Sequence, residues 1–177
     1  MATIPSQTRF PTANQNPENS ILDQFNKQTY LGNSFILAAV DISLSTTNET
    51  LIALIQNVAP NTKSLFMNLR RYTSSAEQVL MKAYLNPTIS TVGTATVPNN
   101  LRPANTNASV STCYVNGNFT VSANGTLYSA LGCPADYYVT LDNNILIILD
   151  PGQSLLITAT ALTEDTVLNS EISWYEL

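Results

Sequence analysis

The chain has 177 residues, of which 44% are hydrophobic and 11% are charged, and its formal net charge is −5. This length suits one domain with a terminal extension, and the hydrophobic content excludes a solvated, disordered chain. Charged residues usually make up about 25% of a domain. A surface so poor in charge favours permanent packing against neighbouring molecules, because few ions have to be desolvated.

Basic and acidic residues are distributed unevenly along the chain. All seven lysines and arginines lie at or before Arg102, with five acidic residues, whereas seven further acidic residues follow it. The two parts therefore carry net charges of +2 and −7. This is either chance in a charge-poor chain or a molecule with a positive and a negative pole that orient its assembly. No basic stripe interleaves with aromatic residues, so binding to nucleic acid is not expected.

The N-terminal segment is predicted to form an extended arm that leads into a short helix. Residues 1–16 contain two internal prolines and show no hydrophobic period. Asn16-Pro17-Glu18 has the pattern of a helix start, with Asn as N-cap and Pro at the first helical position. The helix should stop by Gly32, where a glycine suits the C-terminal cap.

Residues 1–32 are predicted to form a docking arm, and residues 33–177 a separate sandwich domain. The prolines forbid a continuous helix or a central strand. The segment is nevertheless too apolar for a solvated tail, so its side chains should bury against something. We expect a neighbouring subunit, with folding back onto the same chain as the alternative. The side chains expected to contact the partner are Ile4, Arg9, Phe10, Ile21, Leu22 and Phe25.

Short segments with a period of two follow the arm, as expected for β-strands. In the first strand, one face is predicted to carry Ile36, Ala38, Val40, Ile42 and Leu44; in the fourth, Lys82 and Tyr84 should face outward. The predicted strands are residues 35–44, 51–57, 63–72, 77–86, 110–115, 119–121, 137–141, 145–149, 154–162 and 171–177.

Residues 143–162 are predicted to form the central hairpin of the fold. Ile145 to Leu149 is an unbroken apolar run, so we expect this strand to lie inside a sheet with both faces covered. Asp150-Pro151-Gly152-Gln153 has the residues of a turn, with Pro first and Gly second in its centre. The partner strand, residues 154–162, should bury Leu155 and Ile157 on one face.

Two further features are predicted between the fourth strand and the central hairpin. Residues 87–109 are rich in Pro, Thr and Asn and are long for a structureless loop, so they should include a short edge strand or reach a neighbour. Asn116-Gly117 and Asn124-Gly125 are typical of hairpin turns. Cys113 and Cys133 are interpreted as buried thiols rather than a disulfide.

The fold class predicted from these elements is all-β. Eight to ten short strands with regular turn signals favour an antiparallel β-sandwich with an extended N-terminal arm and one short helix. A jelly roll is preferred, because eight strands and one long excursion suit two Greek keys. An immunoglobulin-like sandwich is the alternative.

Residues that carry catalytic chemistry are scarce, so an enzyme is not expected. The chain has no histidine, which removes Ser-His-Asp and Cys-His catalysis and most zinc sites. No cofactor-binding or metal-binding motif is found. Tyrosines on strands could bind sugar, but cross-strand packing or an interface is the favoured interpretation. The set is Tyr72, Tyr84, Tyr114, Tyr128, Tyr137, Tyr138 and Tyr175.

Membrane association and secretion are not expected from the sequence. No run approaches the ~20 apolar residues needed to span a bilayer. Residues 1–10 lack the apolar core of a signal peptide, so synthesis in a cytosol is expected.

Several motifs resemble those of small bacteriophage virion structural proteins. The resemblance covers about residues 50–177 and consists of turn and strand motifs. The matching segments are Asn57 to Lys63, Tyr84-Leu85-Asn86-Pro87-Thr88, Val97 to Leu101, Asp150 to Leu155, and Ile172-Ser173-Trp174-Tyr175-Glu176. None of these motifs contains a catalytic residue.

The resemblance implies a jelly-roll head decoration, or cement, protein that lies on the capsid surface of a phage virion. The expected partners are the major capsid protein and copies of the chain itself, with a homotrimer favoured because such families commonly decorate three-fold positions. The alternative is a tail, fibre or baseplate component that binds a host receptor or glycan. The sequence itself agrees with a passive assembly part, because an extended arm can gain affinity through many weak contacts.

Overall fold

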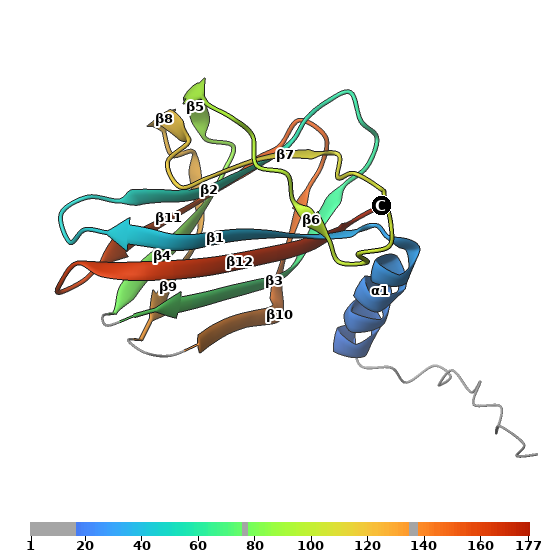
Figure 1. Ribbon diagram of the computed structural model, residues 1–177, viewed down its shortest axis with the longest axis horizontal. Helices are drawn as coiled ribbons and strands as arrows, with labels where there is room; N and C mark the ends of the chain where they lie inside the picture. Colours follow the sequence, from blue (N-terminus) through green and yellow to red (C-terminus); the bar gives the residue numbers. More distant parts are fainter. Residues whose placement is uncertain (1–16, 76–77, 135–137) are drawn as a thin grey trace, which may run out of the picture.

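The computed structural model describes residues 17–75, 78–134 and 138–177, which form an antiparallel β-sandwich with a helix at one end (Figure 1). One sheet has the strand order β10-β3-β12-β1-β6 and is called the first sheet; the second sheet has the order β7-β2-β11-β4-β9. β5 and β8 form a separate pair. The elements are α1 (Pro17–Leu31), β1 (Ser34–Leu44), β2 (Thr50–Asn57), β3 (Leu65–Ser74), β4 (Val79–Leu85), β5 (Thr88–Val92), β6 (Asn99–Asn100), β7 (Ser111–Val115), β8 (Phe119–Ala123), β9 (Thr126–Cys133), β10 (Tyr138–Leu149), β11 (Ser154–Ala161) and β12 (Thr166–Glu176).

The strand order is that of a jelly roll. Four strands of the first sheet, β10-β3-β12-β1, face four of the second, β2-β11-β4-β9, and every pairing is antiparallel. From β1 to β4, and again from β9 to β12, each strand lies in the opposite sheet to the one before it. Two sheets joined in this way are the jelly-roll arrangement. The predicted all-β antiparallel sandwich is therefore confirmed.

The main core lies between the two sheets and is apolar. Trp174 of β12 is fully buried and lies 6.3 Å from Phe35 of β1 between ring centroids. Burying such a side chain contributes roughly 1.5–3 kcal/mol, so the inward-facing residues account for most of the stability of the sandwich. The predicted inward residues Leu155, Ile157 and Ile147 all belong to this core.

A second apolar cluster lies on the outer face of the second sheet, beneath β5 and β8. Leu54, Leu156, Tyr84 and Tyr114 project outward from their strands and are covered by Phe119 of β8, which is only 2% exposed. Tyr84 therefore points outward, as predicted, but is buried because the β5–β8 pair forms a third layer at this place. Lys82, the other residue predicted to face outward, is half-buried on the same face.

The prediction that Ile36, Ala38, Val40, Ile42 and Leu44 share one face of the first strand is wrong. Phe35, Leu37 and Ala39 face the core in its first half, whereas Val40 is 52% exposed. The pairing of β1 with β12 shifts between Ala39 and Ile42, and Asp41 has φ 55°. This β-bulge inserts an extra residue, so the alternation changes phase. Ile42 and Leu44, after the bulge, are buried, so they lie on the opposite face to Val40.

Residues 143–162 do not form the predicted hairpin. β10 pairs with β3 in the first sheet, whereas β11 pairs with β2 and β4 in the second. The turn itself is confirmed, because Gln153 N donates to Asp150 O at 3.0 Å and Gly152 has φ 91°. The two strands that this turn joins lie in different sheets. The residues of the turn are the same in such a crossing as in a hairpin, so the local pattern cannot distinguish the two.

The apolar run 145–149 is the end of an edge strand, not an interior one. β10 continues through both segments that were predicted separately, although Tyr137 lies outside the described residues. Ile148 is 42% exposed on the outer face. The two Asn-Gly turns also lead between different sheets: β8 pairs with β5 and not with β7 or β9, although Asn116 and Gly117 have φ 56° and 69°.

The predictions for residues 87–109 and for the cysteines are confirmed. The long segment contains β5 and the two-residue edge strand β6, which pairs with β1. Cys113 and Cys133 are both free and buried. Burial raises the pKa of Cys113 to about 12 and that of Cys133 to about 11. Both are therefore thiols, not thiolates, at neutral pH and are poor nucleophiles.

The helix ends where the sequence predicts. Gly32 has φ 77°, its N–H donates to Thr29 O at 3.0 Å, and the N–H of Asn33 donates to Gln28 O at 2.8 Å. These two bonds form a Schellman cap, which favours glycine because a Cβ would crowd the left-handed conformation. The cap turns the chain directly into β1.

Candidate functional site

The residues predicted to contact a partner lie at or before the helix. Ile4, Arg9 and Phe10 fall outside the described residues, and the side chains of Ile21 and Leu22 on α1 are likewise outside the description. Phe25 packs edge-to-face on Tyr175 of β12, with ring centroids 6.3 Å apart. The second half of α1 therefore packs against its own sandwich. The prediction of a docking arm now applies only to the residues before this half of the helix.

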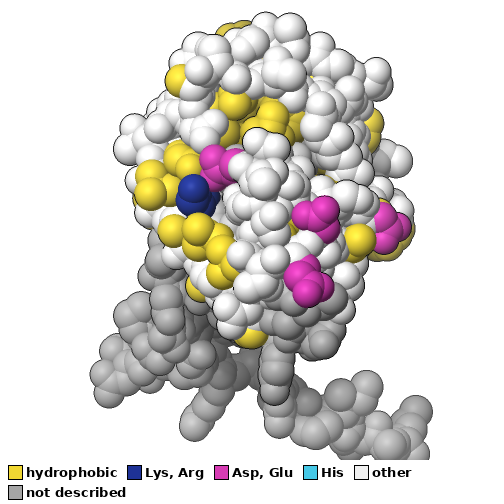
Figure 2. Space-filling model, turned by 90° about the vertical axis from the view of Figure 1, so that its left-hand side faces the viewer, with side chains coloured by type: hydrophobic (Ala, Val, Ile, Leu, Met, Phe, Trp, Pro, Cys, Tyr) yellow, Lys and Arg dark blue, Asp and Glu magenta, His cyan; other side chains and the backbone are white. Residues whose placement is uncertain are grey.

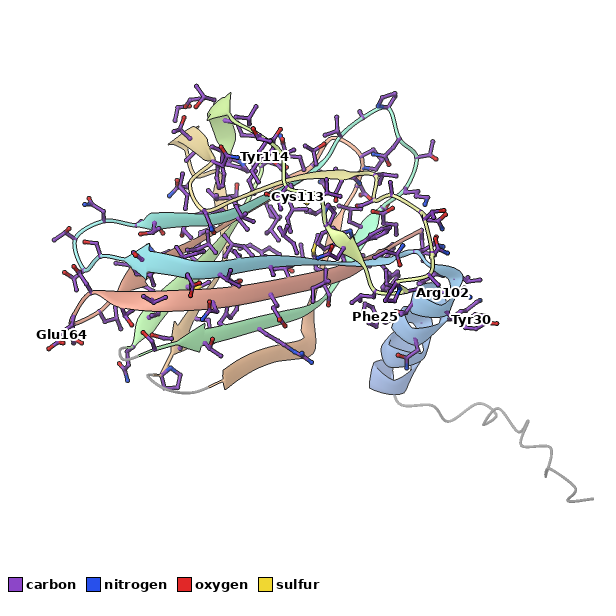
Figure 3. The ribbon with its side chains drawn as sticks, in the orientation of Figure 1. Phe25, Tyr30, Arg102, Cys113, Tyr114 and Glu164 are labelled. Carbon is purple, nitrogen blue, oxygen red and sulfur yellow. The ribbon has the colours of Figure 1, made fainter. Side chains whose placement is uncertain are left out.

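Two side-chain contacts fix the end of α1, one with the loop after β6 and one with the turn before β1. The Arg102 guanidinium donates to the Tyr30 carbonyl and lies 5.0 Å from the centre of the Tyr30 ring (Figure 3). Gln28 is 4% exposed and accepts a hydrogen bond from Asn33 Nδ2 at 2.9 Å. The helix is thus held at its C-terminal half. The chain before it leaves from this end of the sandwich, which we call the helix end.

Two segments singled out in the sequence, Asn57 to Lys63 and Asp150 to Leu155, meet at the helix end. The buried Asn57 side chain donates to Lys63 O at 2.9 Å and to Leu149 O at 2.7 Å. Its backbone N–H donates to Gln153 O at 2.9 Å, and its carbonyl accepts from Gly152. These bonds join the turns after β2 and β10, so the motif residues form one network that fixes how the strands cross between sheets.

The last motif supplies a buried carboxylate to the same end. Glu176 is 1% exposed and accepts hydrogen bonds from Ser109 Oγ and from Val110 N, the latter at 3.1 Å. The Trp174 indole donates to it at 3.4 Å, and Lys63 Nζ lies 3.7 Å from its Oε2. A buried carboxylate needs such partners to offset its desolvation. The network ties the loop before β7 to the C-terminal strand.

A second carboxylate cluster lies on the outer face of the second sheet. Glu49 accepts hydrogen bonds from Thr158 Oγ1 at 2.6 Å, Tyr84 OH at 3.1 Å and Asn124 Nδ2 at 3.0 Å, and lies 3.2 Å from Lys82 Nζ. Burial acts to raise the pKa of Glu49, but the hydrogen bonds from Thr158, Lys82 and Tyr84 outweigh it, so the pKa is lowered. The hydrogen bond to Glu49 raises the pKa of Lys82.

We expect Glu49→Gln to destabilise the protein at pH 7 on the order of 1 kcal/mol, allowing for solvent screening of this partly exposed site. A carboxyl whose folded pKa is lowered stabilises the fold above its unfolded pKa and loses that contribution as pH falls through the folded pKa. The difference in unfolding free energy between wild type and variant, measured in urea, should therefore shrink below about pH 4. An equal difference at pH 7 and pH 3 would contradict this role.

Folding brings together much of the charge that the sequence separates. Lys63 lies beside Glu176, and Arg71 Nη1 is 3.7 Å from Glu171 Oε2. Both acids lie in β12, and both bases lie in β3 or just before it. The pairs form because antiparallel pairing of β3 with β12 places these distant segments side by side. The simple two-pole hypothesis is thus weakened, since these bases are neutralised locally.

An acidic end remains at the opposite end of the sandwich from α1. Asp41, Glu164 and Asp165 are exposed there, and none of the ion pairs between described residues involves them. Figure 3 places Glu164 at this end and Arg102 at the other. Figure 2 looks onto the acidic end and shows a mostly uncharged surface with scattered acidic groups. We call this end of the sandwich, which carries these three exposed carboxylates, the acidic end.

The tyrosines predicted to pack rather than to bind sugar are mostly buried. Four of the seven are 9% exposed or less, namely Tyr72, Tyr84, Tyr114 and Tyr175. Tyr128 is 41% exposed, and the side chains of Tyr137 and Tyr138 lie outside the description. A sugar platform needs exposed ring faces, so the described tyrosines favour the packing interpretation.

The described surface carries open grooves. The one at the acidic end that includes Asp41 has a volume of about 470 Å³ and contains Leu51 and Phe119 in its lining. Residues 17–75, 78–134 and 138–177 contain no group of three or more side chains that could hold a metal ion. No helix in that part of the chain is long and apolar enough to cross a bilayer.

Sequence reasoning missed both carboxylate networks and the groove. Glu49 and Glu176 are single acidic residues in unremarkable contexts, and their partners lie up to 109 residues away. The resemblance to phage motifs did mark Asn57 and Glu176, although without indicating what they contact. Compared with protein-family models and with curated proteins, the chain matches none of them.

Proposed function

We propose that this chain is a non-enzymatic virion structural protein that decorates and stabilises a phage capsid. It would bind the capsid surface and copies of itself, with a trimer favoured. The observation that supports this most is the network around Asn57 and Glu176, because it joins three of the resembling segments, Asn57 to Lys63, Asp150 to Leu155 and Ile172 to Glu176, at one end of a jelly roll. The resemblance is then to an architecture, not to isolated turns.

Two properties of the described surface suit such a role. The molecule is a sandwich with the second half of helix α1 packed against one end. The chain also has few charged residues, 11% of the total, so neighbours can pack against its surface with little desolvation. Both features favour lasting contacts over transient ones.

The location of the chain can be tested by immunogold electron microscopy with antibodies against the purified protein. The sample is the particles produced by the genome that encodes it. Gold on the heads is the expected result. Gold at the tail tip would replace the proposal with its alternative, a fibre or baseplate component that binds a receptor or glycan. Absence of the chain from purified particles would overturn both.

Deleting residues 2–20 should weaken attachment to the particle and leave the melting temperature nearly unchanged. The described contacts of α1 with the sandwich, through Phe25 and Gln28, lie after the deletion and are retained. Calorimetry and co-sedimentation with particles measure the two quantities. As a matched control, Phe25→Ala should lower the melting temperature, because it removes the contact with Tyr175. Unfolding of the truncated chain, or unchanged attachment, would contradict the docking arm.

A further inference from the structure

β1 has a free hydrogen-bonding edge along most of its length. β12 occupies one side, and on the other β6 pairs with it only at Phe35 and Ile36. From Leu37 to Leu44, no strand among the described residues is paired with β1 on that side. The Asn116 side-chain amide approaches the Val40 carbonyl at 3.5 Å, a marginal hydrogen bond. Such an edge is a template for an added extended segment.

The open groove at the acidic end lies beside this free edge. Its walls come from β1 (Asp41 and Ser43), from β2 (Leu51) and from the turn and strand after β7 (Asn116 and Phe119), and its volume is about 470 Å³. This size lies within the range of roughly 300–1,000 Å³ that is usual for ligand pockets. The groove therefore combines a free backbone edge with the half-buried side chain of Leu51.

The bulge in β1 supplies the groove with a charge. Asp41 has φ 55°, and its N–H donates to Asn169 Oδ1 at 2.9 Å. The bulge places this residue in the groove lining, and its carboxylate takes part in no ion pair between described residues. Bulges commonly re-aim a side chain next to a functional site. A positively charged extended segment is the occupant that this groove would favour.

The N-terminal arm has the matching composition. Residues 1–16 contain a single charged side chain, Arg9, followed by the apolar Phe10. Pro5 and Pro11 bracket residues 6–10, which are free of proline. Five residues are the usual length of a short strand, and proline is tolerated just beyond the end of an edge strand. Arg9 suits Asp41, and Phe10 suits the half-buried side chain of Leu51.

A second copy of the chain is the favoured source of this arm. Figure 1 shows α1 at the end of the sandwich away from the turn that follows β7, with its first residues on the side of β10, whereas the free edge of β1 faces away from β10. An arm in its own groove would have to double back across the first sheet. Exchange between copies avoids this, and a head-to-tail contact of this kind can close into a ring such as a trimer.

We propose that residues 6–10 of one copy bind along the free edge of β1 in a second copy, with the Arg9 guanidinium against the Asp41 carboxylate. This inference rests on the proposed function, because it assigns the self-association that the function requires to one surface.

Disulfide trapping between full-length variants tests the contact. Copies carrying Arg9→Cys are mixed with copies carrying Asp41→Cys, and linked dimers are measured on a non-reducing gel and by mass spectrometry of the linked peptide. We expect several-fold more linkage than with Glu164→Cys, an exposed acidic position outside the groove. The native cysteines are buried and do not compete. Equal linkage at both positions, or closure only within one doubly substituted chain, would overturn the inference.

A second measurement uses the wild-type backbone without cross-links. Arg9→Gln and Asp41→Asn should each weaken self-association about two- to fivefold, the range for an exposed ion pair, in sedimentation equilibrium. The double variant should be no weaker than either single one, because one interaction is lost once. Additive losses would show that the two residues do not meet.

Failure of this inference and failure of the proposed function give different results. If trapping fails while deletion of residues 2–20 still detaches the chain from particles, the arm binds another protein, and only the inference is overturned. If trapping succeeds but antibodies find no chain on particles, arm exchange stands and the virion role is wrong.

Discussion

Leu155→Ala is expected to lower the free energy of unfolding by about 2–5 kcal/mol. Leu155 lies in β11, between β2 and β4, and its side chain is fully buried in the main core. Truncation removes apolar contacts and leaves a cavity that neighbouring strands on both sides prevent from collapsing. Urea denaturation followed by intrinsic fluorescence measures the change, since Trp174 lies in the same core.

The matched control is Leu127→Ala in β9, where the same chemical change is made at a side chain that is 53% exposed. Exposed substitutions usually change stability by about 0.5 kcal/mol or less. Equal losses of unfolding free energy in the two variants would contradict the assignment of Leu155 to a core between the two sheets.

Glu176→Ala is expected to destabilise the protein by about 3 kcal/mol. The carboxylate has no exposed side-chain surface and joins Val110 N, Ser109 Oγ, Trp174 Nε1 and Lys63 Nζ. Removing one member of a buried ionic network leaves its partners unsatisfied, which typically costs about 3–5 kcal/mol. The lower value is expected because Lys63 is 40% exposed and can be solvated. Urea denaturation again gives the free energy.

Glu171→Ala provides the comparison, because Glu171 forms an ion pair with Arg71 on the exposed face of the same strand. Exposed pairs contribute about 0–1 kcal/mol, so this variant should be nearly as stable as wild type. Hydrogen exchange should show a further difference: Glu176→Ala should increase exchange at Val110, since its amide loses its acceptor, whereas Glu171→Ala should not. Unchanged exchange at Val110 in Glu176→Ala would contradict the assigned network.

Local patterns in the sequence determined the elements of this fold. The helix end at Gly32 and the turn at residues 150–153 follow from glycine's access to positive φ. The strand β11, which buries Leu155 and Ile157 in the main core, follows from an alternation with a period of two. These features depend on neighbours along the chain, so the sequence alone reveals them, as it does the all-β class and the buried, unpaired cysteines.

The partners of these elements were decided by tertiary structure. The turn at 150–153 looks the same whether its strands pair with each other or cross between sheets, and only the competing partners β3, β2 and β4 select the crossing. The bulge at Asp41 changes which face of β1 points inward. Its position is visible only in the pairing of β1 with β12, whose register differs on its two sides. The covering of Tyr84 depends on β8, more than thirty residues away.

The candidate surfaces show the same division. Composition alone predicted a charge-poor surface and an apolar N-terminal segment, because burial and desolvation depend on residue type. The pairing of Lys63 with Glu176, the cluster around Glu49 and the groove beside Asp41 required the fold, because each joins segments that only strand pairing brings together. Electrostatic and hydrogen-bonding partners are set by distances of a few ångströms in space, on which separation along the chain has little bearing.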